Sequence, residues 1–421
     1  MARIALESLG CKLNQAETES LAWQLRDRGY VIVESAEMAD VYVLNTCTVT
    51  HVADRKARHL LRLARRANPR ATIGATGCYA QRAPGELESL GVVDIVLGNQ
   101  EKHRLAEVLG GRSDLHGDPG RRIGDYRGRT RSLVKIQEGC SSYCSFCVVP
   151  YTRGEERSRP PEEVVEEVRH RVGAGYREVV LTGTKVGAYR WDGEAHSGLA
   201  RLVAHVLRET GVERLRLSSV QPGDLTPDLL SLWADSRLCP HLHMPLQSGS
   251  QAVVERMNRG YSIADYERAV SLARQAVPGL AVTTDVIVGF PGETEAEFEE
   301  SLRFCRRMGF ADIHVFPYSA RPGTPAAALP GQVDERVKRD RARRMLELAR
   351  QSARRFRQEL MGSTALVLWE GQVGHSVWSG LTPNYVRVFA ESERDLTNRL
   401  LNVRLVGEHG RGLLGEVVYG G

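Results

Sequence analysis

The chain has 421 residues, of which 42% are hydrophobic and 26% are charged, and this composition is typical of an ordinary soluble protein. No apolar run approaches the roughly 20 residues that a membrane-spanning helix needs. The opening run, Met1 to Glu7, is too short for a secretory signal and reaches an acidic residue too early. We therefore expect a cytoplasmic protein without membrane contact. The net charge of +5 excludes a histone-like polycation.

Eight cysteines occur in the chain, and a reducing cytosol favours metal or redox chemistry over disulfides. Three are closely spaced, three are spread through the first hundred residues, and two are isolated. We interpret the isolated pair, Cys239 and Cys305, as packing residues.

Residues 1–112 predict a doubly wound domain with a parallel sheet. Strand-like runs and helix patterns alternate there, at 4–9, 14–28, 41–44, 51–67 and 71–75. This alternation is typical of parallel strands with helices on both faces of the sheet. A linker rich in Gly and Arg follows at 110–131, and we place the first domain boundary within it.

Residues 126–358 predict a partial (β/α)6 barrel, which gives the whole chain a mixed α/β fold. Its strand-like runs lie at 134–136, 178–181, 214–217, 241–244, 282–288 and 313–316. A strongly charged helix is expected at about 334–360. Short alternating runs punctuated by glycine over 362–421 predict a small C-terminal β-barrel.

The most specific motif is the C-x3-C-x2-C loop of Cys140, Cys144 and Cys147, directly after a predicted strand. A structural zinc site normally has four ligands, and no fourth Cys or His lies nearby. Three thiolates suit a [4Fe-4S] cluster with one iron open to another ligand. The spacing, with Phe146 before the third cysteine, resembles the radical S-adenosylmethionine (SAM) superfamily, in which SAM chelates the open iron.

Residues at the ends of the next predicted strands favour a cofactor site, because ligands of α/β barrels gather at the carboxyl ends of the strands. Each of these residues alone is common in loops after strands, but their positions at successive strand ends together suggest SAM contacts. The expected SAM-binding residues are Phe146, Gly183, Ser218, Ser219, Gln247, Asp285 and Gly289.

The three spread cysteines, Cys11, Cys47 and Cys78, each follow a predicted strand of the N-terminal sheet. Carboxyl ends of parallel strands meet at one edge of a sheet, and binding crevices form at that edge. Any one of these cysteines could be a buried packing residue, but the repeated relation predicts a second iron–sulfur cluster with one open iron.

These features together resemble the radical SAM methylthiotransferases, over nearly the whole chain. The resemblance implies a cluster-binding domain at 1–112, a radical SAM barrel at 126–358 and a TRAM domain at 362–421. The segments GCKLNQAE, NTCTVT and VKIQEGC resemble the subgroup that modifies N6-threonylcarbamoyladenosine in tRNA. Thr184-Lys185 departs from that subgroup, which commonly has Val-Asn there.

The resemblance implies two [4Fe-4S] clusters and SAM as cofactors, with a methylthio group added at C2 of the modified adenosine at tRNA position 37. C2 is neither acidic nor electrophilic, so a radical is required. The cluster on Cys140, Cys144 and Cys147 would cleave SAM to a 5′-deoxyadenosyl radical. The cluster on Cys11, Cys47 and Cys78 would deliver the methylthio group. An electron donor such as a flavodoxin or ferredoxin, and a sulfur donor, are the implied partners.

Basic helices predict contact with the tRNA anticodon loop, because phosphate contacts dominate affinity for nucleic acids. Residues 51–70 hold seven basic side chains against Asp54 alone. We expect Arg62, Arg65 and Arg66 to bind RNA from this helix. Residues 334–357 hold ten basic and four acidic side chains. In the C-terminal barrel, either shape or the aromatic residues Trp369, Trp378 and Tyr385 would have to contribute.

Three alternatives remain at this stage. The chain could act on isopentenyladenosine in tRNA, although that group usually shows another residue pair after the first cysteine. It could modify an aspartate of a ribosomal protein, although the motifs after Cys11 and Cys47 differ in that branch. It could also be a non-catalytic iron–sulfur sensor that binds RNA.

Overall fold

The computed structural model describes residues 2–110, 130–193 and 197–418. The boundaries predicted at 112 and 126 lie outside the described residues. Internal contacts divide the chain into two compact units. The first unit comprises 1–126, 138–156 and 319–327, and the second unit comprises 127–137, 157–318 and 328–421. None of the described helices has the length and apolar character needed to cross a membrane.

The first unit is built on a parallel sheet of five strands in the order β2-β1-β3-β4-β5. The strands are β1 (Arg3–Ser8), β2 (Val31–Val33), β3 (Val41–Thr46), β4 (Thr72–Gly77) and β5 (Ile95–Leu97). Since β2 pairs on one side of β1 and β3 on the other, the strand order reverses between β1 and β3. Ligands of doubly wound folds bind beside such a reversal.

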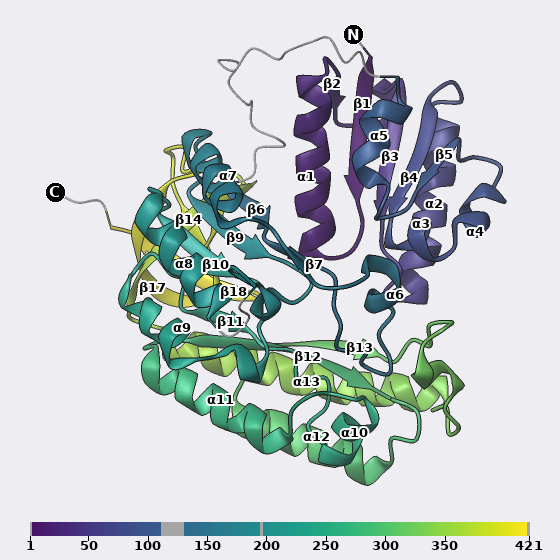
Figure 1. Ribbon diagram of the computed structural model, residues 1–421. Helices are drawn as coiled ribbons and strands as arrows, with labels where there is room; N and C mark the ends of the chain where they lie inside the picture. The colour runs from purple at the N-terminus through teal and green to yellow at the C-terminus, as the bar shows by residue number, and fades with distance from the viewer. Residues whose placement is uncertain (1, 111–129, 194–196, 419–421) are drawn as a thin grey trace. The chain divides into compact units, whose positions relative to one another are not determined.

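Helices cover both faces of this sheet (Figure 1). They are α1 (Lys12–Asp27), α2 (His51–Ala67), α3 (Cys78–Arg82), α4 (Pro84–Glu88) and α5 (Leu105–Val108). Ile4 and Leu6 of β1 pack with α1 and α5, whereas Ala5 between them packs with α2 and α3. Successive side chains of a strand point to opposite faces, so a strand buried on both faces is a continuous apolar run. The predicted doubly wound domain is therefore confirmed.

The second unit contains six parallel strands that pair in chain order, in two groups of three. They are β6 (Arg131–Lys135), β9 (Glu178–Thr182), β10 (Arg214–Leu217), β11 (His241–His243), β12 (Ala281–Val288) and β13 (Asp312–Pro317). Parallel bridges between Leu215 and Leu238, and between Ser219 and His243, join β10 to the β11 side. This matches the predicted open six-stranded α/β barrel.

Helices of the second unit bury one face of these strands. They are α7 (Pro161–Gly173), α8 (Gly198–Glu209), α9 (Pro227–Ser231), α10 (Gln251–Arg256), α11 (Ile263–Ala276), α12 (Glu295–Met308) and α13 (Glu335–Glu359). Val282, Val286 and Val288 of β12 enter the same apolar core as residues of α11 and α12. In sequence, the cysteine loop at 140–147 lies between the short strands β7 (Gln137–Glu138) and β8 (Arg157–Ser158). The helix α6 (Val149–Arg153), which belongs to the first unit, follows this loop.

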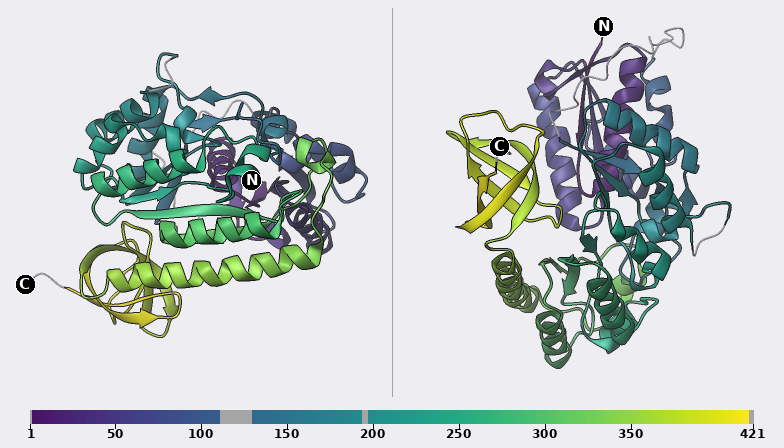
Figure 2. Two further views of the ribbon diagram at one scale, coloured as in Figure 1. Left: turned by 90° about the horizontal axis from the view of Figure 1, so that it is seen from below. Right: turned by 90° about the vertical axis from the view of Figure 1, so that its left-hand side faces the viewer.

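The long helix α13 leads into a closed five-stranded barrel, shown in yellow in Figure 2. Its strands are β14 (Thr364–Gly374), β15 (Val377–Leu381), β16 (Arg387–Glu391), β17 (Leu400–His409) and β18 (Gly412–Val417). The small C-terminal β-barrel is thus confirmed. Trp369 and Trp378, expected to help bind RNA, are instead buried in its core.

A buried ion cluster ties this small barrel to the amino ends of the parallel strands in the second unit. Glu178 accepts from Arg216 at 2.7 Å and lies 2.9 Å from Arg214, and all three side chains are buried. The same two arginines donate to the backbone carbonyls of Leu381, Thr382 and Pro383. The loop after β15 is therefore anchored by two buried guanidinium groups.

Tyr385, the third aromatic residue expected to bind RNA, also belongs to this anchor. Its hydroxyl accepts from Arg131 at 2.9 Å, and its ring lies 4.9 Å from the ring of His241 and 4.6 Å from the Arg216 guanidinium. The expectation that the two buried tryptophans bind RNA is therefore wrong, whereas for Tyr385 the structure shows a role in this anchor.

Replacing Glu178 with Ala should lower the free energy of unfolding by about 3–5 kcal/mol, because it leaves two buried guanidinium groups without their carboxylate. Burial disfavours the charged carboxylate, but Arg216 and Arg214 lower the pKa of Glu178 from 4.5 to about 2. Its stabilising contribution is therefore present above about pH 4.5 and is lost as the pH falls toward 2. Urea denaturation at pH 7 and pH 3 measures both effects.

The matched control is Glu213→Ala, which removes the exposed ion pair with Arg177. Exposed pairs contribute only about 0–1 kcal/mol. Equal loss in the two variants would contradict the anchoring role of Glu178.

Candidate functional site

Cys11, Cys47 and Cys78 lie at the carboxyl edge of the sheet in the first unit, as the sequence predicts. Cys11 caps α1 after β1, Cys47 follows β3 directly, and Cys78 begins α3 after β4. β1 and β3 are the strands between which the strand order reverses. The three thiols therefore gather where a doubly wound sheet binds its ligands.

Two glycines allow the cysteine-bearing turns to approach each other. Gly10 has φ +93°, and a Cβ atom there would lie 2.6 Å from the Sγ atom of Cys47. Gly77 has φ +97°, and its Cβ atom would lie 2.5 Å from the Thr46 carbonyl. Both positions require glycine for conformation and for space.

The thiols of this edge suit a cationic iron–sulfur group. Burial raises the pKa of Cys47 to about 12, whereas Cys11 is exposed to solvent. A desolvated thiol becomes a thiolate when a metal replaces its proton. Three such thiols from adjacent strand ends fit a cluster with one open iron.

A hydrogen-bond network fixes the turn after Cys47, the segment NTCTVT. Thr48 donates to Asp54 at 2.6 Å and accepts from Arg82 at 2.9 Å. Arg321, which is buried, donates to Thr48 at 2.9 Å and to Asp54 at 2.5 Å. Thr50 caps α2 by accepting from the Ala53 backbone N–H. The two threonines that follow Cys47 in this segment therefore shape the cysteine edge.

The second cysteine set, Cys140, Cys144 and Cys147, lies in a tight loop of the same unit. The Cys140 N–H donates to the Gly154 carbonyl, and the Cys147 N–H donates to the Cys144 carbonyl at 2.9 Å. Tyr143 has φ 45°, an unusual conformation for a residue that is not glycine. Cys144 is buried, whereas Cys140, Cys147 and Phe146 are half-buried. A loop held this way presents three thiols from eight consecutive residues.

The short helix α6 after this loop contacts the first cysteine set, which the sequence did not predict. Arg153 donates to Asn14 at 2.6 Å and to both carboxylate oxygens of Glu17. Asn99 donates to the Sγ atom of Cys78 at 3.4 Å and to the Thr152 carbonyl at 2.9 Å. Only the position of Arg153, six residues after Cys147, hints at this role.

In the second unit, several of the predicted SAM-binding residues follow strand ends. Gly183 comes after β9, and a Cβ atom there would lie 3.0 Å from the Gln137 carbonyl. Ser218 and Ser219 come after β10. Ser218 Oγ and Thr184 Oγ1 are buried and have no hydrogen-bond partner among the described residues. Orphaned hydroxyls after neighbouring strands are what a polar cofactor would satisfy.

Gln247 and Gly289 have unusual backbone conformations. Gln247 has φ 70° and still exchanges backbone hydrogen bonds with β12, through Asp285 and Ile287. Such strain in a residue other than glycine is common at functional sites. Gly289 has φ +73°, but Lys338 occupies the space beside it, since a Cβ atom on Gly289 would lie 2.4 Å from the Lys338 Cγ atom. A side chain of α13 therefore lies beside Gly289, and contact of Gly289 with SAM stays a prediction.

Asp285 lies within β12, not at its end as the sequence suggested. It contacts His243 at 3.2 Å and His314 at 3.0 Å, from the strands on either side. Burial opposes its ionisation, but these two hydrogen bonds hold the pKa of Asp285 well below its usual range. Within the described residues, these three side chains form the one group of possible metal ligands whose atoms all lie within 4.8 Å of one another.

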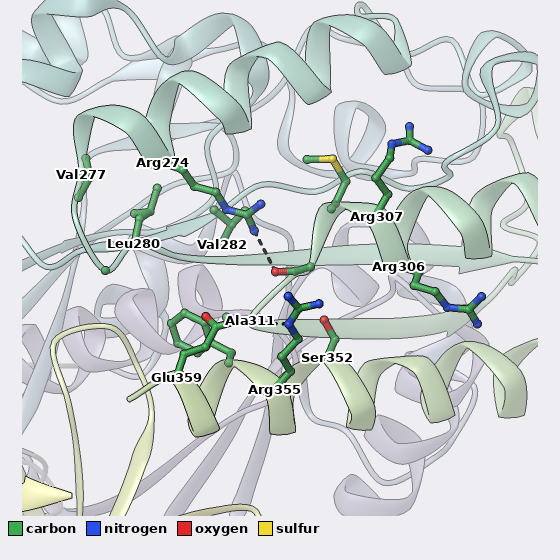
Figure 3. A pocket seen from close by; sticks show the side chains of 14 residues that line it. Arg274, Val277, Leu280, Val282, Arg306, Arg307, Ala311, Ser352, Arg355 and Glu359 are labelled. Atoms are coloured by element: carbon green, nitrogen blue, oxygen red, sulfur yellow. Dashed lines mark hydrogen bonds and ion pairs between the residues drawn. The ribbon is translucent and has the colours of Figure 1, made fainter. Parts of the chain in front are cut away.

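A pocket of about 370 Å³ in the second unit lies at the amino ends of the strands (Figure 3). Leu280 and Val282 line it from the start of β12, and its arginines are Arg274, Arg306, Arg307 and Arg355. Arg274 donates to the Gly309 carbonyl at the end of α12. Cations near a helix carboxyl end neutralise its dipole. We therefore assign Arg274 to the stability of this helix end.

The predicted RNA-binding arginines of α2 do not share one environment. Arg62 and Arg66 are exposed and make no ion pair with the residues that the structure describes. Arg65 instead donates to Ala71 at 2.7 Å, to Asp94 at 2.5 Å and to two further backbone carbonyls. Arg65 is therefore committed to the fold, which leaves Arg62 and Arg66 as the accessible cations.

Comparisons with known proteins agree with this arrangement. Residues 134–305 match the radical SAM superfamily, and residues 3–98 match the uncharacterized protein family UPF0004. A solved radical SAM methyltransferase, TsrM from Kitasatospora setae, shares the fold with a TM-score of 0.57 at 17% identity, covering 78% of this chain and 77% of that one.

Two curated relatives extend over nearly the full length. The threonylcarbamoyladenosine tRNA methylthiotransferase MtaB of Bacillus subtilis is 39% identical, over 96% of this chain and 94% of its own. The tRNA-2-methylthio-N(6)-dimethylallyladenosine synthase of Syntrophotalea carbinolica is 36% identical, over 98% and 99%. The chain is therefore an enzyme that belongs to the radical SAM tRNA methylthiotransferase family.

Proposed function

We propose that this enzyme transfers a methylthio group to C2 of N6-threonylcarbamoyladenosine at position 37 of tRNA, in the cytoplasm. The observation that carries the proposal is the pair of three-cysteine sets, one at the carboxyl edge of the first sheet and one in the tight loop before α6. The choice of nucleoside rests on the segments around Cys11 and Cys47 and on relatives with that printed activity at 38–39% identity.

Each cysteine set would hold one [4Fe-4S] cluster, and the two would do different work. Bound there, the clusters and SAM supply reductive SAM cleavage and the sulfur that is transferred. The protein keeps the Cys47 thiol away from water, and its glycine turns bring Cys11 and Cys47 together. Gly183, Thr184 and Ser218 would contact SAM, since two of them carry orphaned hydroxyls.

The proposed reaction requires partners that supply electrons and sulfur. Reductive cleavage needs an electron donor such as a flavodoxin or ferredoxin, and repeated turnover needs a sulfur donor. The anticodon loop would meet two of the exposed cations of α2, Arg62 and Arg66. Because phosphate contacts release counterions, they make affinity depend on salt.

The substrate is tested by mass spectrometry of tRNA nucleosides from a strain that lacks the gene. The 2-methylthio derivative of threonylcarbamoyladenosine should disappear and return when the wild-type gene is restored. Loss of the 2-methylthio derivative of isopentenyladenosine instead would assign the chain to the second group of relatives. Unchanged tRNA with a modified ribosomal aspartate would remove tRNA as the substrate.

Anaerobically reconstituted protein should hold roughly eight irons, four for each cysteine set. Replacing Cys140, Cys144 and Cys147 with Ala should leave about four irons and abolish SAM cleavage. The control is Cys239→Ala together with Cys305→Ala, which removes two buried thiols that lie in neither set and should keep the full iron content. Reductive SAM cleavage by the triple variant would contradict the assignment.

The variant with Ala at Cys11, Cys47 and Cys78 should separate the roles of the two sets. It should also hold about four irons and still release 5′-deoxyadenosine from SAM, because the second set is intact. It should give no methylthiolated tRNA, because the sulfur-bearing site is gone. Liquid chromatography of the nucleosides and of deoxyadenosine measures both. Full product formation would exclude the first cysteine set from the reaction.

Changing Arg62 and Arg66 to Gln should weaken tRNA binding and flatten its salt dependence, with a slope smaller by about two units. SAM cleavage without tRNA should be unchanged. Filter binding at several salt concentrations measures the slope. Arg303→Gln with Arg306→Gln, which removes two exposed arginines of α12, is the matched control. Equal effects of both pairs would indicate general charge, not a docking site.

A further inference from the structure

The helix α6 begins two residues after Cys147 and ends at Arg153, so the loop of the second cysteine set leads directly into it. Its last two residues are the ones that reach the first cysteine set. Arg153 and Cys11 share one acceptor, because the Asn14 side-chain oxygen accepts from Arg153 at 2.6 Å and lies 3.9 Å from the Cys11 thiol. Asn14 is fully buried.

A second bridge runs through Asn99. Its side-chain nitrogen donates to the Sγ atom of Cys78 at 3.4 Å and to the Thr152 carbonyl at 2.9 Å. Adjacent residues of α6 are therefore linked to two different cysteines of the first set. Both bridges lie wholly within the first unit.

Arg153 is held in a buried network that fixes its position. Glu17 accepts from it at 2.9 Å and also accepts from Lys102 at 2.6 Å, and all three side chains are buried. Glu138 accepts from the same guanidinium at 3.2 Å. The Arg153 guanidinium is therefore held beside Asn14, whose side-chain oxygen lies 3.9 Å from the Cys11 thiol.

We infer that Asn99 and Arg153 are positioning residues that tune the cluster on Cys11, Cys47 and Cys78 and tie its geometry to α6. The inference rests on the proposed function. An N–H donor to a ligand sulfur and a nearby buried cation both favour the more negative, reduced state of a cluster. The two residues therefore raise the reduction potential of this cluster. Because α6 continues the other cysteine loop, the same contacts connect the two cofactor sites.

The test uses the full chain with Cys140, Cys144 and Cys147 changed to Ala, so that only the first set carries iron. In this background, Asn99→Asp keeps the side-chain shape but replaces the N–H donor with a negatively charged carboxylate oxygen, and Arg153→Gln removes the cation. Both should lower the midpoint potential in a redox titration followed by electron paramagnetic resonance. Arg153→Lys should restore part of the shift, because it returns the charge without the forked hydrogen bonds.

The control is Asn68→Asp, the same change at the opposite edge of the same sheet, where Asn68 donates to the Ala39 carbonyl. Its potential should match the background. Loss of iron by Asn99→Asp, with circular dichroism and thermal midpoint equal to the control, would support the positioning role. Unchanged potentials in iron-loaded Asn99→Asp and Arg153→Gln would overturn the inference. If Arg153→Gln fails to fold, Asn99→Asp decides alone.

Failure of this inference can be distinguished from failure of the proposed function. A wild-type protein that bound only four irons would contradict the two-cluster assignment itself. Potentials that stay constant in variants with a loaded first set would contradict only the role of Asn99 and Arg153.

Discussion

The parallel pairing of β1, β3 and β4 is the constraint on which the candidate site depends. Parallel strands direct all their carboxyl ends to one edge. Cys11, Cys47 and Cys78, which are separated by 36 and 31 positions in the sequence, therefore become neighbours. The reversal of strand order between β1 and β3 leaves that edge open to a ligand. Helices on both faces bury the strands and fix their register. A site of this kind needs no local sequence motif, because the sheet itself assembles it.

Buried arginines then connect the cysteine sites to the rest of the first unit. Arg153 is paired with Glu17, and Arg321 is paired with Asp54 and Thr48. Burying charges is costly unless they are paired and hydrogen-bonded, so each guanidinium must keep its partners in place. A planar fork that bonds two or three acceptors holds separate chain segments in one geometry. Buried ion pairs of this type therefore serve positioning more than net stability.

The architecture could be predicted from sequence because apolar periodicity is a local signal, and the second cysteine set because its spacing is short. The positions of Cys11, Cys47 and Cys78 at one sheet edge could be predicted only because each cysteine follows a predicted strand. The network around Arg153 could not, since its partner Glu17 is 136 residues away. The same limit explains Arg65: a basic helix face looks uniform in sequence, yet only the fold supplies the carbonyls that Arg65 binds. The role of Tyr385 in the barrel anchor could not be predicted either, because its partners Arg131 and Arg216 lie on strands that are distant in sequence.

The central claim is that a two-cluster enzyme of this family selects the threonylcarbamoyl-modified nucleoside. It is tested most directly with purified, reconstituted protein and two anticodon stem-loops, identical except for threonylcarbamoyladenosine or isopentenyladenosine at position 37. Both RNAs compete in one reaction with SAM and a reductant, and mass spectrometry follows the products. The account predicts methylthiolation at C2 of the threonylcarbamoyl stem-loop alone. Preferential modification of the isopentenyl stem-loop would contradict it.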